Sequence, residues 1–420
     1  MNDVADFGLD AFVGTLPGLT GPDGGPFFGR GDPIIVARAP GRLDVMGGIA
    51  DYSGSLVLEL TIRQAAFAAV QLQADSAVHV VSLGMDGMPS RKASRADVSE
   101  PGPSTGSNRW ADYILGAFTV LAPDRAVRFG RGARICIGST VPEGRGVASS
   151  AAVEVAAMSA IVSAYELAVD ARTIALLCQR LENEVIGVPC GPMDQFTVAL
   201  AEESSLFALL CRPAEELPAV AFPDGVVAIG IDSGTSHSNA GAAYRRARAA
   251  AFMGKNMLEQ HLGALAYLTE LEPIELLKQE GRLPEVLVER GEWYPVRAAV
   301  RHAVEELERA QEFAELLPRA RSRSELEHLG ALMNQSHAGY SACGLGSKET
   351  DSVAETLRAV PGVFGARVSG GGSGGTVAAL IDVEALPRVA EMARGRRLTL
   401  FSGSSPGAAH FGMRTVALPA

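Results

Sequence analysis

The sequence predicts a two-domain α+β protein, and three observations support this fold class. At 420 residues the chain is longer than a single hydrophobic core normally supports. Short strand-like apolar runs and longer segments with helical periodicity occur in both halves. A proline-rich link containing Pro213, Pro218 and Pro223 lies near the middle of the chain. We therefore expect one domain over residues 1–213 and a second over residues 214–420.

Individual elements follow from apolar periodicity and from the residues that begin and end helices. In the first half we expect helices from near Trp110, from Ser149 to about Leu167, and from an Asp170 cap to about Ile186. In the second half helical periodicity dominates residues 239–262 and 296–340. Residues 38–54, dense in Gly, Asp and Arg, indicate a functional loop. Strands are expected at 34–37, 55–60, 66–71, 78–82, 127–137, 205–210, 226–232, 366–369, 376–381 and 398–401.

Composition excludes several classes of protein. A hydrophobic content of 47% with 20% charged residues is typical of a soluble globular protein, and the net charge of −11 argues against a nucleic-acid partner. No apolar run approaches the roughly 20 residues that span a bilayer, and the first residues lack a signal-peptide pattern. The five cysteines are scattered without C-x-x-C spacing, so we expect neither a disulfide framework nor a zinc site. Unpaired cysteines are typical of a reducing compartment, so we expect a cytoplasmic location.

The stretch Pro142–Ala151 combines glycines with an expected helix start. Gly144 and Gly146 precede Ser149, where helical periodicity begins. A helix N-terminus presents unpaired N–H groups, and preceding glycines let an anion approach the backbone closely. The stretch therefore indicates a phosphate site. On this stretch alone, a glycine turn into a buried, serine-capped helix explains the pattern equally well.

Other motif classes are not supported. No stretch matches the P-loop G-x-x-x-x-G-K-[ST] or the H-R-D loop of protein kinases. Residues 371–375 and 403–407 match G-x-S-x-G, but the first leads into an expected strand and the second contains proline. A hydrolase nucleophile requires a strand, a tight turn and a helix, so neither match indicates one. A flexible turn is the alternative interpretation of the glycine run 370–375.

Three stretches in order resemble the motifs of the GHMP small-molecule kinase superfamily, specifically its galactokinase-like branch. Residues 39–53 match the frame of A-P-G-R-V-N-L-I-G-E-H-T-D-Y-N, residues 142–151 that of P-x-G-x-G-L-S-S-S-A, and residues 370–375 that of G-G-G-x-G-G. Residues 189–195, 232–238 with Tyr244, and 110–113 are also similar. The resemblance implies a ribosomal-protein-S5-domain-2-like N-terminal domain, a ferredoxin-like C-terminal domain and an active site in the cleft between them.

The resemblance also implies roles for individual residues. Asp194 would be the catalytic base that takes the proton from the sugar hydroxyl, and Arg42 would keep it ionised and stabilise developing charge. Gly191 and Gly371 would contact the substrate. The alternatives are a helix cap for Asp194 and a surface ion pair for Arg42.

ATP and Mg²⁺ are the implied cofactors. Ser150 and Glu182 would ligate Mg²⁺, which prefers oxygen ligands. Glu182 alone could also be a solvated carboxylate at a helix end, and Trp110, expected at the adenine, could be an ordinary residue of an amphipathic helix. Phosphates would be held by the following residues: Gly144, Gly146, Val147, Ala148, Ser149, Ser150 and Ala151.

The first motif departs from galactokinases at two positions. Gly48 and Ile49 replace the Glu and His that contact the sugar's 6-hydroxyl there, whereas Asp51, which grips O3 and O4, and Tyr244 are kept. A galactose O6 buried beside Ile49 would be unpaired, at a cost of about 1–3 kcal/mol. The site therefore indicates L-arabinopyranose, which is galactopyranose without C6.

The sequence of residues 37–55, 141–157 and 340–346 resembles the kinase domain of plant L-arabinokinases. Those proteins carry an additional N-terminal glycosyltransferase-like region, for which this chain is too short, so we expect only the kinase half. The expected reaction converts ATP and L-arabinose to ADP and β-L-arabinose 1-phosphate by direct in-line transfer. A galactokinase with another O6 partner, a non-catalytic sugar sensor and a sugar-acid kinase are the rivals. We expect a monomer whose partners are a small sugar and ATP.

Overall fold

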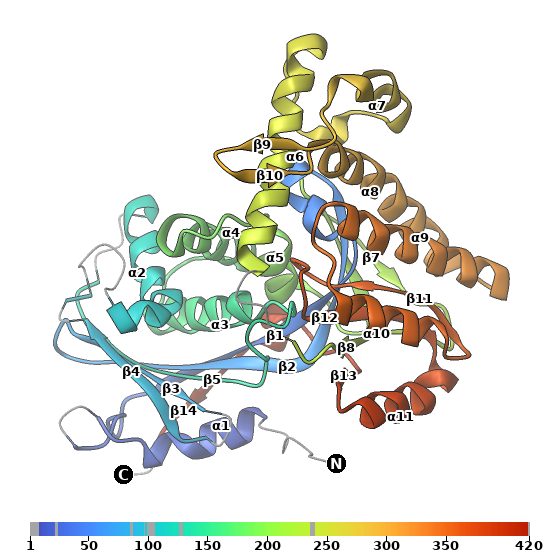
Figure 1. Ribbon diagram of the computed structural model, residues 1–420. Coiled ribbons are helices and arrows are strands. Elements are labelled where there is room, and N and C mark those ends of the chain that lie inside the picture. The colour runs from blue at the N-terminus through green and yellow to red at the C-terminus, as the bar shows by residue number, and fades with distance from the viewer. Residues whose placement is uncertain are drawn as a thin grey trace.

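Two β-sheets form the centre of the protein, and helices cover them (Figure 1). The computed structural model describes residues 8–21, 24–84, 87–95, 97–98, 106–125, 129–235 and 240–418. Within these residues, no helix is both long enough and apolar enough to cross a membrane. The mixture of mainly antiparallel sheets and separate helices confirms the α+β class.

The larger sheet has eight strands in the order β14-β1-β2-β5-β3-β4, and β6 and β7 extend it beyond one end of β2. Neighbouring strands are antiparallel except for the parallel pair β3 and β5. Its long central strands are buried along nearly their whole length. The strands are β1 (Ile34–Met46), β2 (Leu56–Leu72), β3 (Val78–Leu83), β4 (Pro89–Arg95), β5 (Ala133–Ser139), β6 (Ser205–Leu210), β7 (Glu215–Ala221) and β14 (Met413–Val416).

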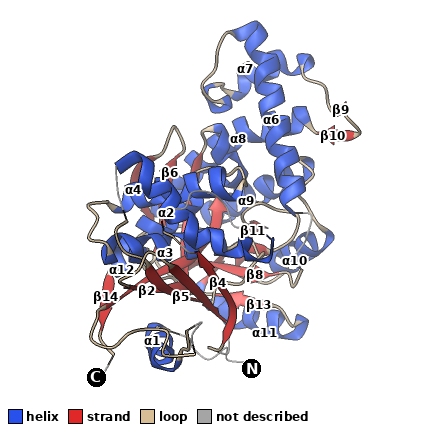
Figure 2. Cartoon of the chain, turned by 90° about the vertical axis from the view of Figure 1, so that its left-hand side faces the viewer, coloured by secondary structure: helices blue, strands red, loops and turns tan. Residues whose placement is uncertain are grey.

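Alternate residues of β2 face two different clusters, as the period of a strand requires. Ala66, Ala68 and Val70 pack under the helices of one face, and Phe67 packs against α1 (Leu9–Thr15) on the other. The covering helices are α2 (Asp112–Arg125), α3 (Ser149–Ala164), α4 (Ala171–Arg180), α5 (Met193–Leu200) and α12 (Ala408–Phe411). Figure 2 shows α2, α3, α4 and α12 above the strands β2, β5 and β4, and α1 below them.

The smaller sheet has four strands in the order β11-β12-β8-β13. With α10 (Lys348–Arg358) and α11 (Leu386–Arg396) it follows a βαββαβ path, the ferredoxin-like topology expected. These two helices pack on one face, and the other face meets β1, β2, α8 (Val296–Leu316) and α9 (Arg323–Ala342). The strands are β8 (Val226–Asp232), β11 (Val363–Val368), β12 (Thr376–Asp382) and β13 (Thr399–Phe401).

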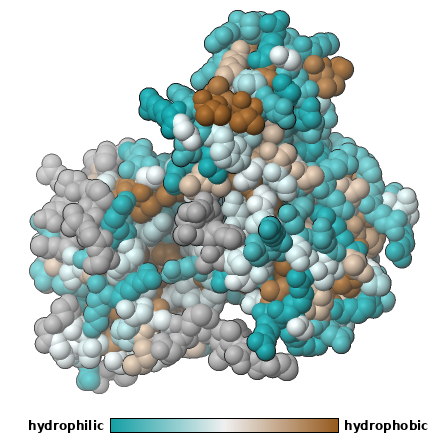
Figure 3. Space-filling model, viewed as in Figure 1, coloured by the Kyte–Doolittle hydropathy of each residue, from teal (hydrophilic) through white to brown (hydrophobic). Residues whose placement is uncertain are grey.

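A projection extends from the second half of the chain beside α6 (Ala240–Leu262) (Figure 1). It contains α7 (Pro273–Gln279) and the hairpin of β9 (Leu287–Glu289) and β10 (Glu292–Tyr294). Several exposed large apolar residues lie here, among them Val288 and Trp293. Figure 3 shows apolar surface on this projection, whereas most of the molecular face in that view is hydrophilic.

Three sequence expectations need correction. The expected loop 38–54 is instead the second part of β1, followed by a 3₁₀ helix, Gly48–Ser53, because its Gly, Asp and Arg residues are buried and bonded within the protein. The two strands expected at 55–60 and 66–71 are one continuous strand, β2, which pairs with β1 on both sides of an irregularity between Thr61 and Ala65. The strand expected at 127–137 begins later, at Ala133, and ends at Ser139.

The helix expectations agree more closely with the structure. α3 begins at Ser149, and the Asp170 side chain accepts a hydrogen bond from the backbone N–H of Thr173 at the start of α4. A π-helix, Leu181–Ile186, continues α4 until Gly187 ends it with a left-handed conformation.

The expected boundary at residue 213 divides the larger sheet. Strand β7 lies beyond it and pairs with β6, and β14 returns from the end of the described chain to pair with β1. We propose that the two domains divide at residues 222–225, with residues 402–418 returning to the first.

Candidate active site

Arg42 and Asp194 form the centre of the site. Arg42 lies in β1 and is 2% exposed, and Asp194 lies in the first turn of α5. The guanidinium donates from Nε and Nη2 to the same oxygen of Asp194, Oδ1, at 3.0 and 2.6 Å. A surface ion pair, the alternative considered for Arg42, is therefore ruled out. The Asp194 side chain keeps 24% exposure, so it remains accessible to a ligand.

Glu59, on β2, is a second carboxylate against Arg42. Its side chain is completely buried, and Oε2 lies 2.9 Å from Arg42 Nε. Burial by itself would lower the pKa of Arg42, but the charges of Asp194 and Glu59 raise it, so the guanidinium stays charged. Burial raises the pKa of Glu59 well above its usual value, and the charge of Asp44 adds to this increase. The Arg42 guanidinium thus contacts two carboxyl groups, that of the buried Glu59 and that of the partly buried Asp194.

The glycine loops of the two sheets meet beside Arg42. Gly144 and Gly146 have positive φ angles of 69° and 70°, which glycine adopts without strain. A Cβ atom on Gly146 would lie 2.8 Å from the carbonyl oxygen of Ser369, and one on Gly370 would lie 2.8 Å from the carbonyl oxygen of Gly146. The carbonyl oxygen of Gly146 also accepts a 2.7 Å hydrogen bond from Arg42 Nη1. The loops of the second and third motifs therefore touch backbone to backbone.

Asp51 lies in the 3₁₀ helix after β1 and is 3% exposed. Burial raises its pKa to about 7, and the nearby charge of Asp194 adds to the increase. A Cβ atom on Gly191 would lie 2.0 Å from Asp51 Oδ2, which explains why this position holds glycine. Tyr244 lies on α6; burial raises the pKa of its hydroxyl well above the usual value, and the nearby charge of Asp51 adds to the increase. A Cβ atom on Gly371 would lie 3.7 Å from the Tyr244 ring. The structure thus brings Asp51, Gly191, Tyr244, Gly371 and Asp194 into one region.

Gly48 and Ile49 are buried beside Tyr340 of α9. Ile49 is 1% exposed and packs in an apolar cluster with Ala243, Ala247 and Tyr340. Its backbone N–H donates a 2.9 Å hydrogen bond to the Tyr340 hydroxyl. Burial leaves neither position in contact with solvent.

Ser150 and Glu182 form a hydrogen-bonded pair close enough to Asp194 for its charge to act on Glu182. Burial, together with the charge of Asp194, raises the pKa of Glu182 to about 7, and a hydrogen bond from the Ser150 hydroxyl opposes this increase. The Gln195 amide nitrogen donates to Oε2 of Glu182 at 2.7 Å and to Oε2 of Glu154 at 3.2 Å. Glu182 is 7% exposed, so it is not the solvated carboxylate that was the alternative.

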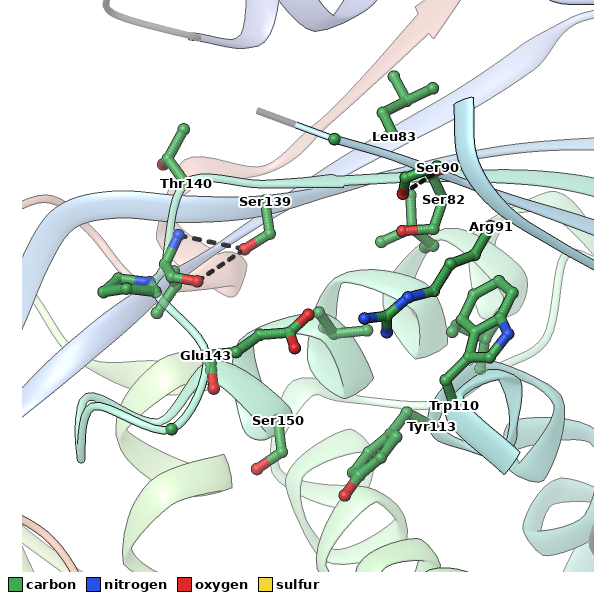
Figure 4. Close-up of a pocket in the computed structure, with 18 residues that line it drawn as sticks. Ser82, Leu83, Ser90, Arg91, Trp110, Tyr113, Ser139, Thr140, Glu143 and Ser150 are labelled. Carbon is green, nitrogen blue, oxygen red and sulfur yellow. Dashed lines mark hydrogen bonds between the residues drawn. The ribbon is translucent and has the colours of Figure 1, made fainter. Parts of the chain in front are cut away.

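A cavity of about 590 Å³ opens beside the start of α3. Its lining includes Trp110, Gly144, Ser149 and Ser150, whereas Val147 and Ala151 are buried in the core behind it. Figure 4 shows the Glu143 carboxylate and the Arg91 guanidinium directed toward each other across this cavity. Trp110 and Tyr113 lie on the Arg91 side (Figure 4). Ala148 adopts a left-handed conformation at the N-cap of α3. In the motif over 232–238, Ser236, His237 and Ser238 lie outside the described residues.

Sequence reasoning missed three buried polar residues of this region: Glu59, Glu154 and Gln195. Glu59 and Glu154 are single carboxylates in otherwise apolar runs. A lone charge in a segment predicted to be buried is a signal that could have identified both. Gln195 follows Asp194 directly, but nothing in the sequence indicates that its amide bridges two glutamates.

Three family profiles match the chain. The GHMP kinases N terminal domain matches residues 112–202, the GHMP kinases C terminal family matches residues 303–396, and a galactokinase galactose-binding signature matches residues 26–72. The first segment contains α2 to α5, the second contains α9 to α11 with β11 and β12, and the third contains the Arg42 and Asp51 motif.

Individual relatives agree with the profiles. An L-arabinokinase of Arabidopsis thaliana is 35% identical over 92% of this chain, and this chain spans about half of that protein, 47%. A galactokinase of Chloroflexus aggregans is 31% identical, over 85% of this chain and 86% of that protein. The solved structure of Lactococcus lactis galactokinase complexed with galactose has the same fold, with a TM-score of 0.75 at 22% identity, over 92% of this chain and 95% of that one.

The fold and the paired glycine loops define a two-domain small-molecule kinase. The chain belongs to the GHMP kinase family, in the branch that holds galactokinases and L-arabinokinase.

Proposed function

We propose that the protein is an ATP-dependent sugar 1-kinase that phosphorylates L-arabinose to β-L-arabinose 1-phosphate. Kinases of this family use ATP as the phosphate donor. The observation that carries the proposal is the Arg42–Asp194 pair, which lies between the glycine loops and the buried Asp51 region. A kinase of a hydroxyl group needs a base, a cation near the transferred phosphoryl group and a phosphate cradle, and these features supply all three.

In the proposed step, Asp194 accepts the proton of the sugar's anomeric hydroxyl as that oxygen bonds to the γ-phosphorus. The bond from the γ-phosphorus to the β–γ bridging oxygen breaks, and ADP leaves with that electron pair. Arg42 holds the accepting carboxylate in place and offsets the negative charge that develops on the phosphoryl oxygens. No covalent enzyme intermediate is needed.

The proposed Mg²⁺ site consists of Ser150 and Glu182. The oxygen donors of both side chains fit a hard cation, and Oε1 of Glu154 and Oε1 of Gln195 are buried nearby without a hydrogen-bond partner. Bound Mg²⁺ would neutralise phosphate charge. The cavity beside Trp110 and Tyr113 is the proposed place of the adenine, with Gly144 and Ser149 near the phosphates.

The choice of L-arabinose depends on Gly48 and Ile49. Both are buried and apolar, so neither side chain would replace the hydrogen bonds to water that a hydroxymethyl group beside them loses. The Arabidopsis L-arabinokinase, at 35% identity, supports the same choice. Galactokinase activity is the second candidate, because the galactose-binding signature matches residues 26–72 and galactokinases are among the relatives.

The test is ADP release from MgATP with L-arabinose, D-galactose, D-glucuronate or no sugar, followed by phosphorus NMR of the product. We expect the highest kcat/KM with L-arabinose and a phosphate ester at C1. A preference for D-galactose would select the second candidate. Sugar and MgATP binding without turnover would indicate a non-catalytic sensor, and a preference for D-glucuronate would indicate a sugar-acid kinase.

A further inference from the structure

The Tyr340 hydroxyl joins the first and third motifs in the interior of the protein. Tyr340 is 0% exposed. Its oxygen accepts the N–H of Ile49 at 2.9 Å and lies within donating distance of the Gly370 carbonyl oxygen, 2.9 Å, and of Asp44 Oδ2, 3.2 Å. A single side chain of α9 therefore contacts both the segment after β1 and the glycine loop after β11.

Asp44 belongs to the same buried cluster. It is 0% exposed and pairs with Arg367 of β11, with 2.6 Å between Arg367 Nη1 and Asp44 Oδ1. The Arg367 guanidinium also lies over the Tyr340 ring, 5.0 Å from its centroid. Asp44 stands where the galactokinase motif has Asn, four residues before Gly48, which stands where that motif has Glu. The negative charge beside Arg367 is thus carried by position 44 in this chain.

Gly48 has no room for a side chain. A Cβ atom there would lie 1.9 Å from the Tyr340 hydroxyl, 2.4 Å from Asp44 Oδ2 and 2.8 Å from Arg367 Nη2. Its φ of 40° is also in the region that glycine favours. The volume that a Glu side chain would start from is therefore filled by Tyr340 and by the Asp44–Arg367 pair.

We propose that Asp44, Gly48 and Tyr340 form one specificity-determining unit of the sugar site. This inference rests on the proposed function and extends it. Tyr340 occupies the space that a Glu side chain at position 48 would need to bind a hydroxymethyl group. Asp44 supplies the negative charge that this Glu would bring. The substitutions Gly48→Glu and Ile49→His alone would place a second carboxylate beside Asp44 in the protein interior, which is strongly unfavourable. A change of sugar preference therefore requires positions 44, 48, 49 and 340 together.

The first test measures thermal unfolding, which needs no assumption about the sugar. We expect Gly48→Ala to lower Tm, because the added methyl group meets the Tyr340 hydroxyl. Gly48→Ala with Tyr340→Phe should lower Tm by less than the sum of the two single changes. Gly263→Ala is the matched control, since Gly263 has a φ of 88° and open space around its Cβ position. Additive Tm changes at 48 and 340 would overturn the packing unit.

The second test compares Gly48→Glu/Ile49→His with the same pair combined with Asp44→Asn and Tyr340→Phe. The fourfold variant keeps one carboxylate beside Arg367. We expect its ratio of kcat/KM for D-galactose over L-arabinose to exceed that of the twofold variant by about 10-fold or more. An equal shift in the folded twofold variant would overturn the unit. A wild-type preference for D-galactose would instead refute the proposed substrate, and the Tm comparison separates these two failures.

Discussion

Both hydrogen bonds from Arg42 to Asp194 end on one oxygen, Oδ1, and so leave the other oxygen of this carboxylate outside the pair. Asp194 is 24% exposed, whereas Arg42 is 2% exposed. The arginine is fixed in the interior and holds the carboxylate at the edge of the site. This geometry lets a charged pair remain in place while one oxygen stays available to a hydroxyl group.

Asp194→Asn should reduce kcat by about 10²–10⁴-fold, because an amide cannot accept the proton of the attacking hydroxyl. The change keeps the shape of the side chain, so sugar affinity should remain close to that of the wild type. Steady-state kinetics and calorimetric titration with sugar measure the two effects separately. Activity equal to that of the wild type would remove Asp194 from the proposed step.

Arg42→Met should destabilise the protein by about 3 kcal/mol, because it leaves Glu59 in the interior without its cation. Adding Glu59→Gln should recover much of that loss of unfolding free energy, since the uncompensated carboxyl group is then gone. Neither variant should recover turnover. Urea denaturation and ADP release are the measurements. If the second change failed to recover stability, the Arg42–Glu59 contact of 2.9 Å would not be the cause.

The raised pKa of Asp51 should make the free energy of unfolding depend on pH. Its pKa is about 7 in the folded protein, against about 3.9 in an unfolded chain. Between these two pKa values the folded state binds more protons than the unfolded state does. The contribution of Asp51 to the free energy of unfolding therefore falls as pH rises from about 4 to about 7. The full effect approaches about 4 kcal/mol as an upper limit.

Asp51→Asn should therefore raise Tm relative to the wild type more at pH 8 than at pH 5, measured without sugar. Sugar binding should be lost at both pH values, because the proposed partner of the ring hydroxyls is changed. The same Tm offset at pH 5 and pH 8 would contradict the raised pKa.

Trp110→Ala should raise KM for ATP by about 10-fold, which corresponds to about 1.4 kcal/mol of lost contact, and leave KM for the sugar unchanged. The chain has two tryptophans, and the other, Trp293, provides a matched control. Trp293 lies on the β9–β10 hairpin, 41% exposed and away from the cavity. Equal effects of the two substitutions on KM for ATP would contradict the proposed nucleotide position.

Glu182→Gln should increase the Mg²⁺ concentration required for half-maximal activity and weaken Mg²⁺-dependent ATP binding measured by calorimetry. Glu184→Gln is the control, because Glu184 is exposed and pairs with Arg180. The control should match the wild type. A Glu182 variant with unchanged Mg²⁺ dependence in both assays would show that the metal is held elsewhere.

The sequence predicted the fold class and most helices because those features depend on local periodicity and capping. The Asp170 cap and the Gly187 stop are examples, since both act within a few residues of their position. The glycine loops and their neighbours were identified through a resemblance to known motifs, which includes Arg42 and Asp194. The same resemblance implied that Arg42 acts on Asp194, and the folded structure brings these two residues, 152 positions apart, into hydrogen-bond contact.

What the sequence could not predict is the burial of polar residues by distant segments. The first motif was expected as a loop, yet Arg42 and Asp44 lie buried within β1, where Asp194 and Arg367 compensate their charges from other parts of the chain. Glu154 and Gln195 meet for the same reason. The effect of Tyr340 on Gly48 depends on packing between α9 and β1, which no local pattern contains.

Strand β14 pairs with the outer edge of β1, where Ile34 lies opposite Val416. During synthesis on a ribosome, that edge of β1 is made before the second domain and β14 is made after it, so the second domain emerges while the edge is still uncovered. An uncovered strand edge can pair with other chains. Newly made protein should therefore be most prone to aggregation when translation pauses between residues 223 and 413, and chaperone demand should drop once β14 is released.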